Sequence, residues 1–174
     1  MKVIRSLLAA ALCLAYASVL WAAEGPKKKN WTAPAEKIRA QALADEIMSQ
    51  HPELISVTFH GVPPGLDKVY TMFAGSFPER IGNPDDPDDV DIIEKGITIV
   101  DPRWHRTKDT VKKFVMMVPL RDAAGENVGG LVLAYKVPSP VARSETEFFA
   151  AASALRDELK PRIASHADLF KPAN

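Results

Sequence analysis

A predicted β-hairpin constrains the fold of this chain more than any other sequence feature. Residues 113–120 and 128–136 are apolar runs rich in β-branched and methionine side chains, as is typical of buried strands. Between them, residues 121–127 contain Asp122 and Gly125, which predict a type I turn followed by a glycine in left-handed geometry. The sequence therefore predicts the last two strands of a sheet in this region.

Three shorter segments before the hairpin also have the composition of strands. Residues 54–60 alternate between apolar and polar side chains and include β-branched and aromatic ones. Residues 69–74 form a second such run, and residues 97–100 form a third. Prolines and glycines within residues 61–65 force a loop between the first two runs. Together with the hairpin, these segments predict five strands.

A long helix is predicted before the strands, from Thr32 to Gln50. Thr32 is its predicted N-cap, and Pro34 is tolerated in a first turn. Pro52 ends the helix because the residue before a proline is pushed out of helical geometry. The apolar residues of the helix do not form one narrow stripe; they are Ile38, Leu43, Ile47 and Met48. The helix can therefore pack against its own domain or against a second copy of the chain in a homodimer.

A short connecting helix is predicted after the second strand, ending at Glu94. Asp88 or Asp89 is its predicted N-cap, and the carboxylates of residues 85–91 suit the positive end of the helix dipole. Clustered carboxylates also suggest calcium, but an EF-hand loop needs a glycine at its sixth position and a glutamate at its twelfth. Neither is present in this run, so helix capping is the favoured interpretation and no metal site is predicted.

A C-terminal helix is predicted from its start signal and its periodicity. Ser144 and Glu147 form a capping box. Pro161 is predicted to end or kink the helix, and the tail from Ser165 onward is predicted to fray. One apolar face is predicted by the helical spacing of Phe148, Ala152, Leu155 and Leu159.

Residues 1–23 have the layout of a secretory signal peptide. Two basic residues precede an apolar run from Leu7 to Leu20, and the small residues Ala22 and Ala23 follow it. The apolar run is short for a membrane span, which needs roughly 20 residues, so cleavage is favoured over an uncleaved anchor. The chain is therefore predicted to be exported, periplasmic or secreted, with residues 24–31 as a linker to the domain.

Cysteine and charge content exclude several classes of protein. The single cysteine, Cys13, lies in the predicted leader, which excludes disulfides, thiolate metal ligands and covalently attached haem from the mature chain. Removing the two basic leader residues from 22 leaves 20 against 22 acidic residues, so no nucleic-acid surface is expected. About 150 mature residues suffice for one domain with an ordinary core.

The block of residues 78–136 resembles the extracytoplasmic PAS-like sensor domains called Cache domains. It begins with the segment Pro78-Glu79-Arg80-Ile81-Gly82, continues through the acidic helix and ends in the hairpin. The resemblance covers residues 32–137 and implies an α+β fold, with residues 138–174 as the C-terminal helix and tail. The implied fold is a PAS-like five-stranded antiparallel sheet with a long N-terminal helix, a short connecting helix and a ligand pocket beside the sheet.

The sharpest local likeness is to the periplasmic domains of citrate and dicarboxylate sensor kinases, which carry a similar Pro-Glu-Arg-Ile-Gly segment. Those domains have a histidine and another basic residue in the preceding strand, where this chain has Gly75 and Met72. Met117 and Val115 likewise replace basic side chains of their fourth strand. The carboxylate-binding set of these kinases is missing, so citrate is not the expected ligand.

The predicted ligand contacts are His60, Tyr70, Arg103, Trp104, His105 and Tyr135. A tyrosine in a strand can bury its ring and aim its hydroxyl into a cavity. The loop after the third strand, which covers the pocket in Cache domains, combines aromatic and donor groups that suit a small polar molecule. The structural alternatives are a half-exposed histidine, core tyrosines and a solvated loop. Arg80 is assigned to an ion pair with the acidic run of residues 85–91.

The sequence contains no nucleophile elbow, His-Glu-x-x-His motif or phosphate-binding glycine loop, so no enzyme is predicted. The favoured function is a periplasmic module that binds a small polar or anionic molecule and reports to a membrane-bound sensor partner, without a cofactor. One alternative is a non-covalent haem or redox protein with His60 or His105 as axial ligand. The other is a structural accessory protein that binds no small ligand.

Overall fold

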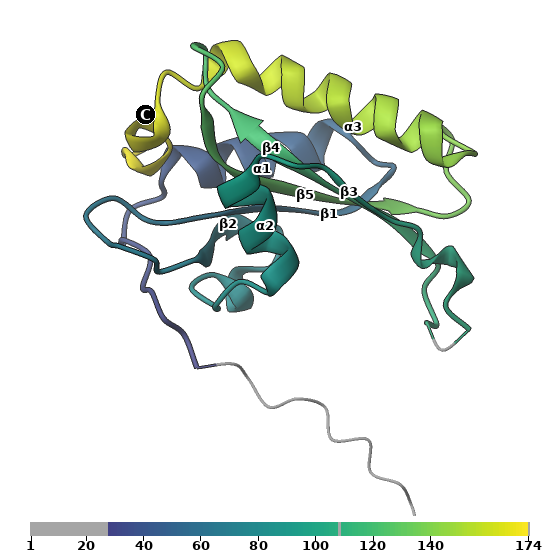
Figure 1. Cartoon of the computed structure of the whole chain (residues 1–174), viewed down its shortest axis with the longest axis horizontal. Coiled ribbons are helices and arrows are strands. Elements are labelled where there is room, and N and C mark those ends of the chain that lie inside the picture. The colour runs from purple at the N-terminus through teal and green to yellow at the C-terminus, as the bar shows by residue number, and fades with distance from the viewer. Residues whose placement is uncertain (1–27, 108, 174) are drawn as a thin grey trace, which may run out of the picture.

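The computed structural model describes residues 28–107 and 109–173, so the predicted leader lies outside the described residues (Figure 1). The described chain forms one antiparallel sheet in the order β2-β1-β5-β4-β3. The predicted α+β fold with a five-stranded antiparallel sheet is confirmed. The strands are β1 (Leu54–Gly61), β2 (Thr71–Gly75), β3 (Ile99–Asp101), β4 (Lys113–Arg121) and β5 (Asn127–Lys136).

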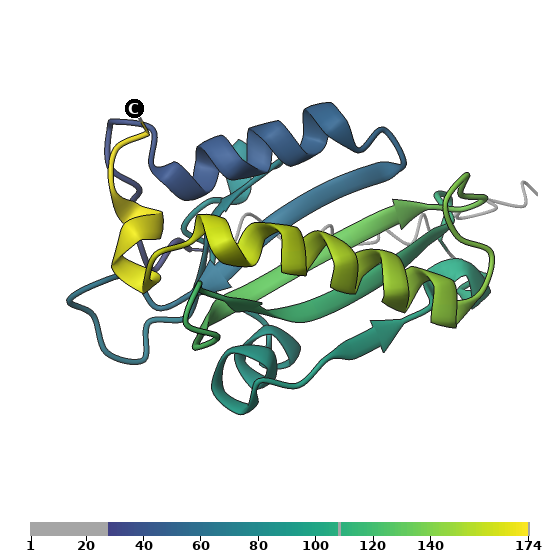
Figure 2. The same ribbon diagram turned by 90° about the horizontal axis from the view of Figure 1, so that it is seen from above.

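Helices cover the two faces of the sheet unequally. On one face, α1 (Arg39–Gln50) lies over β1 and β2, and α3 (Glu145–Leu159) lies beside it over β4 (Figure 2). On the other face, the short helix α2 (Pro87–Lys95) packs against β1, β4 and β5 (Figure 1). None of the helices in the described ranges is both long enough and apolar enough to cross a bilayer.

Strand alternation divides the interior into two layers, because successive strand residues point to opposite faces. Val57 and Phe59 of β1 belong to the main core under α1 and α3, whereas Thr58 and His60 point to the α2 face. The apolar cluster on the α2 face is small and consists of Ile92, Val115, Met117 and Ala134. Since α2 covers only part of this face, polar side chains of the sheet meet an open space beside it.

The hairpin between β4 and β5 confirms the predicted turn. Gly125 has a φ of 92°, and its N–H donates to the carbonyl of Asp122 at 2.9 Å. The Asp122 Oδ1 atom accepts two further backbone N–H groups, from Ala124 and Glu126, each at 3.0 Å. The left-handed conformation of Gly125 explains why a glycine stands at this position.

The C-terminal helix is confirmed, but the predicted fraying of the tail is wrong. The Ser144 capping box is present, and the buried residues of α3 are the predicted four. Beyond Pro161, residues His166–Phe170 form a 3-10 helix in which Leu169 is fully buried. The Arg39 N–H donates to the carbonyl of Lys171 at 2.8 Å, so the tail docks against the start of α1.

Two predicted helix starts are also wrong. The helix α1 starts at Arg39 instead of Thr32, because Ile38 has an extended backbone and pairs with Pro172 of the docked tail. The N-cap of α2 is Asp86 instead of Asp88 or Asp89, with Asp89 completing a capping box. Pro87 follows this cap in the first helical position, where its missing N–H is tolerated.

Candidate functional site

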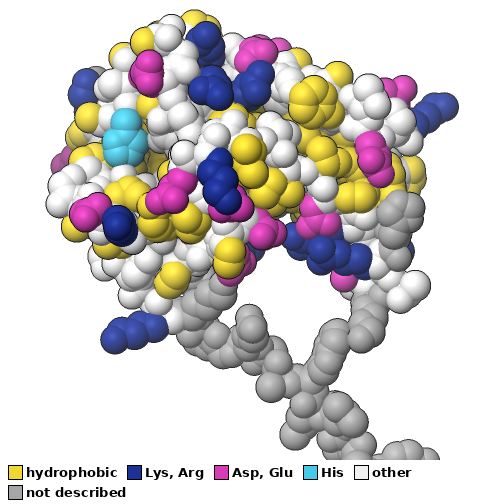
Figure 3. All heavy atoms as spheres, in the orientation of Figure 1, with side chains coloured by type: hydrophobic (Ala, Val, Ile, Leu, Met, Phe, Trp, Pro, Cys, Tyr) yellow, Lys and Arg dark blue, Asp and Glu magenta, His cyan; other side chains and the backbone are white. Residues whose placement is uncertain are grey.

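A pocket of about 230 Å³ opens on the α2 face of the sheet. β1, β4 and β5 form its floor, and residues around the start of α2, from the loop before α2 and from the loop after β3 form its sides. Figure 3 shows this face hollowed between the region of α2 and the chain that links β3 to β4, with acidic and basic side chains along the edge. Its volume is below the roughly 300–1,000 Å³ of sites for drug-sized ligands, which suits a small molecule.

Two larger hollows have fewer features of a ligand-binding site. One, of about 500 Å³, is mostly apolar and lies beside Trp104 and Phe148. The other, of about 340 Å³, lies against the loop of residues 62–66. Unlike these two hollows, the pocket on the α2 face brings buried polar side chains of the described chain together with basic and acidic ones, so it is the candidate site.

A polar stripe of β1 forms part of the floor of this pocket. Ser56, Thr58 and His60 point to the same face because side chains in a strand alternate, and all three are buried. Buried polar groups need hydrogen-bond partners, so a polar stripe on an interior strand indicates that this position is not selected for apolar packing alone.

Three basic side chains also line the pocket. Arg80 lies over the ring of Phe77, with 5.4 Å from its guanidinium carbon to the ring centroid. Arg103 donates from Nε to Asp101 Oδ2 at 2.6 Å, which fixes the direction of its side chain. Lys113 projects from the first residue of β4. The pocket can therefore offer positive charge to a ligand from two loops and one strand.

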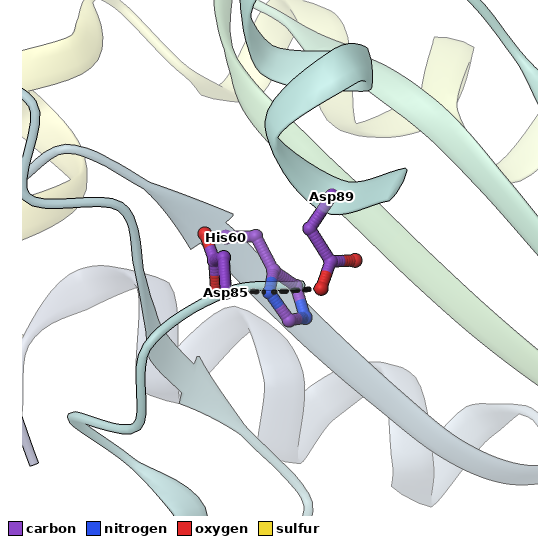
Figure 4. A group of neighbouring side chains, drawn as sticks. All are labelled: His60, Asp85 and Asp89. Carbon is purple, nitrogen blue, oxygen red and sulfur yellow. Dashed lines mark hydrogen bonds and ion pairs between the residues drawn. The ribbon is translucent and has the colours of Figure 1, made fainter. Parts of the chain in front are cut away.

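His60 is held between two aspartates, Asp85 and Asp89, which lie on either side of its ring (Figure 4). Its Nδ1 atom is 2.7 Å from Asp85 Oδ1 and 3.6 Å from Asp89 Oδ2. Its Nε2 atom is 2.7 Å from the hydroxyl oxygen of Thr58. Both ring nitrogens of His60 thus have hydrogen-bond partners inside the protein.

The chain before α2 brings Asp85 to the end of β1. Thr71 of β2 pairs with Pro84, and the Asp85 N–H donates to the carbonyl of Tyr70 at 3.2 Å. Residues 82–85 therefore run beside the start of β2, which is itself paired with β1. Asp85 and His60 are far apart in sequence, and no local pattern in the sequence indicated their contact.

The pKa values of His60 and Asp85 are both raised. Burial lowers the pKa of His60, but the hydrogen bond and charge of Asp85, aided by the charge of Asp89, outweigh it and raise the pKa. Burial raises the pKa of Asp85, and the hydrogen bond from His60 offsets this only in part. Both shifts mean that the cluster holds a proton more strongly than free imidazole and carboxylate groups do.

The structure brings together two of the six predicted ligand contacts. His60 and Arg103 both line the pocket. Tyr70 lies outside the pocket lining, and its hydroxyl donates to Glu94. The side chain of His105 lies outside what the structure describes.

Trp104 and Tyr135 lie on the opposite face of the sheet from the pocket. Tyr135 is 2% exposed and packs with its ring centroid 5.2 Å from that of Phe148. Trp104 packs on Phe114, with centroids 4.8 Å apart. Both are residues of the main core or its edge, so their predicted place in the same pocket as His60 is corrected.

Comparison with known proteins finds distant structural likenesses. Neither a family model nor a curated protein matches the chain. The sensor domain of Escherichia coli DcuS is similar over 56% of this chain and 66% of that chain, at 17% identity and a TM-score of 0.38. The GAF domain of a two-component sensor histidine kinase from Bacillus halodurans is similar over 74% and 91%, at 13% identity and a TM-score of 0.46.

A third likeness is to an enzyme, the type II free methionine-R-sulfoxide reductase from Thermoplasma acidophilum. It covers 66% of this chain and 83% of that chain, at 15% identity and a TM-score of 0.43. At such low identities and TM-scores, these likenesses carry no information about the ligand of this chain. The function therefore has to be inferred from the pocket itself.

Proposed function

We propose that this chain is a sensor-type module that binds a small polar molecule with an anionic group in the pocket on the α2 face. The observation that carries this proposal is the meeting of Arg80, Arg103 and Lys113 around a floor of buried polar side chains. Converging polar groups on a concave, partly apolar surface are the usual features of a small-molecule site.

The pocket offers both signs of charge to a ligand. Arg103 and Lys113 lie toward the β3–β4 side, whereas Asp88 and Asp89 belong to the first turn of α2. A guanidinium can hold a carboxylate through two parallel hydrogen bonds. The fitting ligand carries a carboxylate or similar anion at one end and hydrogen-bond donors at the other, as hydroxy acids and amino acids do.

The test is a thermal-shift screen of organic acids and amino acids against the purified protein, with EDTA present throughout. A ligand at a hundredfold excess over its dissociation constant should stabilise the protein by about 2.7 kcal/mol. Arg103→Gln and Lys113→Gln should each weaken the response at least fivefold because they remove positive charge from the pocket. Tyr70→Phe is the matched control and should keep the response, since Tyr70 lies outside the pocket lining.

Two results would overturn this proposal. The first is that no organic acid or amino acid shifts the melting temperature of the wild type, which would favour the accessory-protein alternative. The second is a ligand response that survives both charge-removing variants. The haem alternative is not favoured at His60, because its side chain is buried and the pocket beside it, at about 230 Å³, is smaller than the sites of drug-sized ligands.

We further propose that the module is exported and reports to a membrane-bound partner. The support for export is the basic, apolar and small-residue order of residues 1–23. Mass spectrometry of a periplasmic extract should find a chain that starts near Glu24, and an intact Met1 there would contradict export with cleavage.

Homodimerisation through the N-terminal helix also stays a proposal. The outer face of α1 carries ion pairs, such as Glu46 with Arg162 at 2.6 Å and Asp45 with Lys37 at 2.8 Å. A dimer interface on this helix would therefore be polar. Light scattering of the purified protein, compared with a Glu46→Arg variant, would show whether α1 holds two copies together.

A further inference from the structure

We propose that His60, Asp85 and Asp89 form a binding site for a divalent transition-metal ion at the inner wall of the pocket. The ligand atoms of the three side chains lie within 4.8 Å of one another. They come from the end of β1, the segment beside β2 and the first turn of α2, so three separate parts of the fold converge on this point (Figure 4). The proposed ion needs no organic ligand and does not depend on the function proposed above.

The distances suit a small ion after modest movement of side chains. Zinc binds imidazole nitrogen and carboxylate oxygen at about 2.0–2.2 Å, which places two ligand atoms of a tetrahedral ion about 3.3–3.6 Å apart. The distance of 3.6 Å from His60 Nδ1 to Asp89 matches this separation, whereas the distance of 2.7 Å from Nδ1 to Asp85 has to lengthen when an ion binds. An ion takes the place of the Nδ1 proton, which is released to solvent on binding.

The second imidazole nitrogen of His60 already has the partner that a metal-bound histidine requires. Metal-ligating histidines generally donate their other N–H to a nearby oxygen, which fixes the ring orientation and the tautomer. Here Nε2 lies 2.7 Å from the Thr58 hydroxyl, whose oxygen can accept this hydrogen bond when Nε2 carries the proton. With Nε2 as the N–H donor, Nδ1 is the nitrogen that faces both carboxylates.

An unpartnered buried oxygen is the independent observation that points to an ion. The side chain of Asp85 is 0% exposed, and its Oδ2 atom has no hydrogen-bond partner among the described residues. A buried carboxylate oxygen without a partner is costly, and a bound cation is one means by which proteins satisfy such an oxygen. A cation beside His60 that this carboxylate binds through both oxygens would give Oδ2 the partner that it lacks, and Asp89 would share the ion.

The donor set indicates the class of ion. One imidazole and two carboxylates suit zinc and manganese, whereas calcium prefers six to eight oxygen ligands. Three protein ligands leave coordination positions open, as in catalytic or ligand-binding zinc sites. His60 and Asp89 line the pocket, so an ion held by them would border the space that Arg80, Arg103 and Lys113 also line.

The experiment is a calorimetric titration of the tag-free protein, dialysed against EDTA and then freed of chelator, with zinc chloride or manganese chloride. Saturable binding of one ion is expected, and Asp85→Asn and Asp89→Asn should each weaken it at least tenfold. Thr58→Val should weaken it about tenfold because it removes the acceptor for His60 Nε2. Asp88→Asn is the matched control, since Asp88 lines the same pocket outside the cluster, and it should change binding less than twofold.

A second measurement keeps the proposal testable if Asp85→Asn fails to fold. Long-range proton–nitrogen NMR of the wild type should show the Nδ1 resonance of His60 moving on addition of zinc, and Asp89→Asn should reduce this change. Absence of saturable zinc or manganese binding to the wild type would overturn the proposal. An equal loss of binding in Asp88→Asn, or an unchanged His60 resonance, would show that the ions are attracted to surface carboxylates in general. Either result would also overturn the proposal.

Discussion

Replacing Phe148 by alanine should destabilise this protein more than most single substitutions. Phe148 is 1% exposed and stacks on Phe114 with ring centroids 4.3 Å apart and planes 10° apart. The rings of Trp104 and Tyr135 lie 5.8 Å and 5.2 Å away. Phenylalanine-to-alanine changes in cores cost about 3–5 kcal/mol. The upper half of this range is expected because strand-borne aromatic rings cannot easily collapse into the space.

The assay is urea unfolding followed by circular dichroism, with tryptophan fluorescence as a second probe. A loss of about 4 kcal/mol is a large part of the 5–15 kcal/mol that usually stabilises a domain, and corresponds to a fall in melting temperature of about 10 °C. Phe149→Ala is the matched control on the same helix, and its side chain is 46% exposed. The control should change stability by less than about 0.5 kcal/mol.

Two results would refute this reasoning. A loss below about 1.5 kcal/mol for Phe148→Ala would show that the aromatic cluster is not closely packed under α3. Equal losses for Phe148→Ala and Phe149→Ala would show that α3 is rotated about its axis relative to the sheet. In that case the capping box and helical spacing would still be correct, and the packing of the helix would not.

Three further predictions concern the turn, the helix cap and the buried ion pair. Gly125→Val should lower the free energy of unfolding by about 1 kcal/mol or more, because the backbone of Gly125 has a φ of 92°. Gly130→Ala is the control and should be milder, because no atom lies closer than 3.6 Å to a Cβ added there. Equal melting temperatures of the two variants would contradict this prediction. Ser144→Ala should cost about 1 kcal/mol by removing the acceptor for the Glu147 N–H, measured by urea unfolding, and an unchanged midpoint would contradict it. The pKa of His60 is raised in the folded protein, so protonation of His60 stabilises the fold. This stabilisation is fully present below about pH 6.5, the pKa of a free histidine, and is lost as the pH rises through the pKa of the folded protein. In EDTA, stability measured between pH 6 and 9 should therefore fall, and Asp85→Asn should abolish this fall; an identical pH profile in the variant would show that Asp85 does not hold the His60 proton.

Local signals were sufficient where the structure depends on neighbouring residues. The turn at Asp122 and Gly125 and the capping box at Ser144 depend on hydrogen bonds between residues a few positions apart. The local sequence pattern was not sufficient where a distant segment of the chain pairs with the same residues. Thr32 and Pro34 suggested a helix start, but pairing of Ile38 with Pro172 holds the preceding chain extended.

The site shows the same division between local and distant information. The alternation of β1 sets the face of the sheet to which His60 points, and Arg103, in the loop after β3, lines the pocket on that face. Trp104 and Tyr135 could not be assigned to a face from the sequence, because an aromatic ring suits a core and a cavity equally well. The acidic run was interpreted as helix capping, which holds for Asp86 and Asp89 but misses the role of Asp85.

The sequence by itself determined the element order, the hairpin turn and the apolar face of the C-terminal helix, because each depends on backbone preferences and periodicity within one segment. Only the tertiary structure decided that Asp85 lies beside His60, since this contact joins the chain before α2 to the end of β1. It also decided which side chains share a pocket, because strand register and helix docking set the face on which each residue lies. A local pattern contains no information on register between distant strands, and the chemistry of this site depends on it.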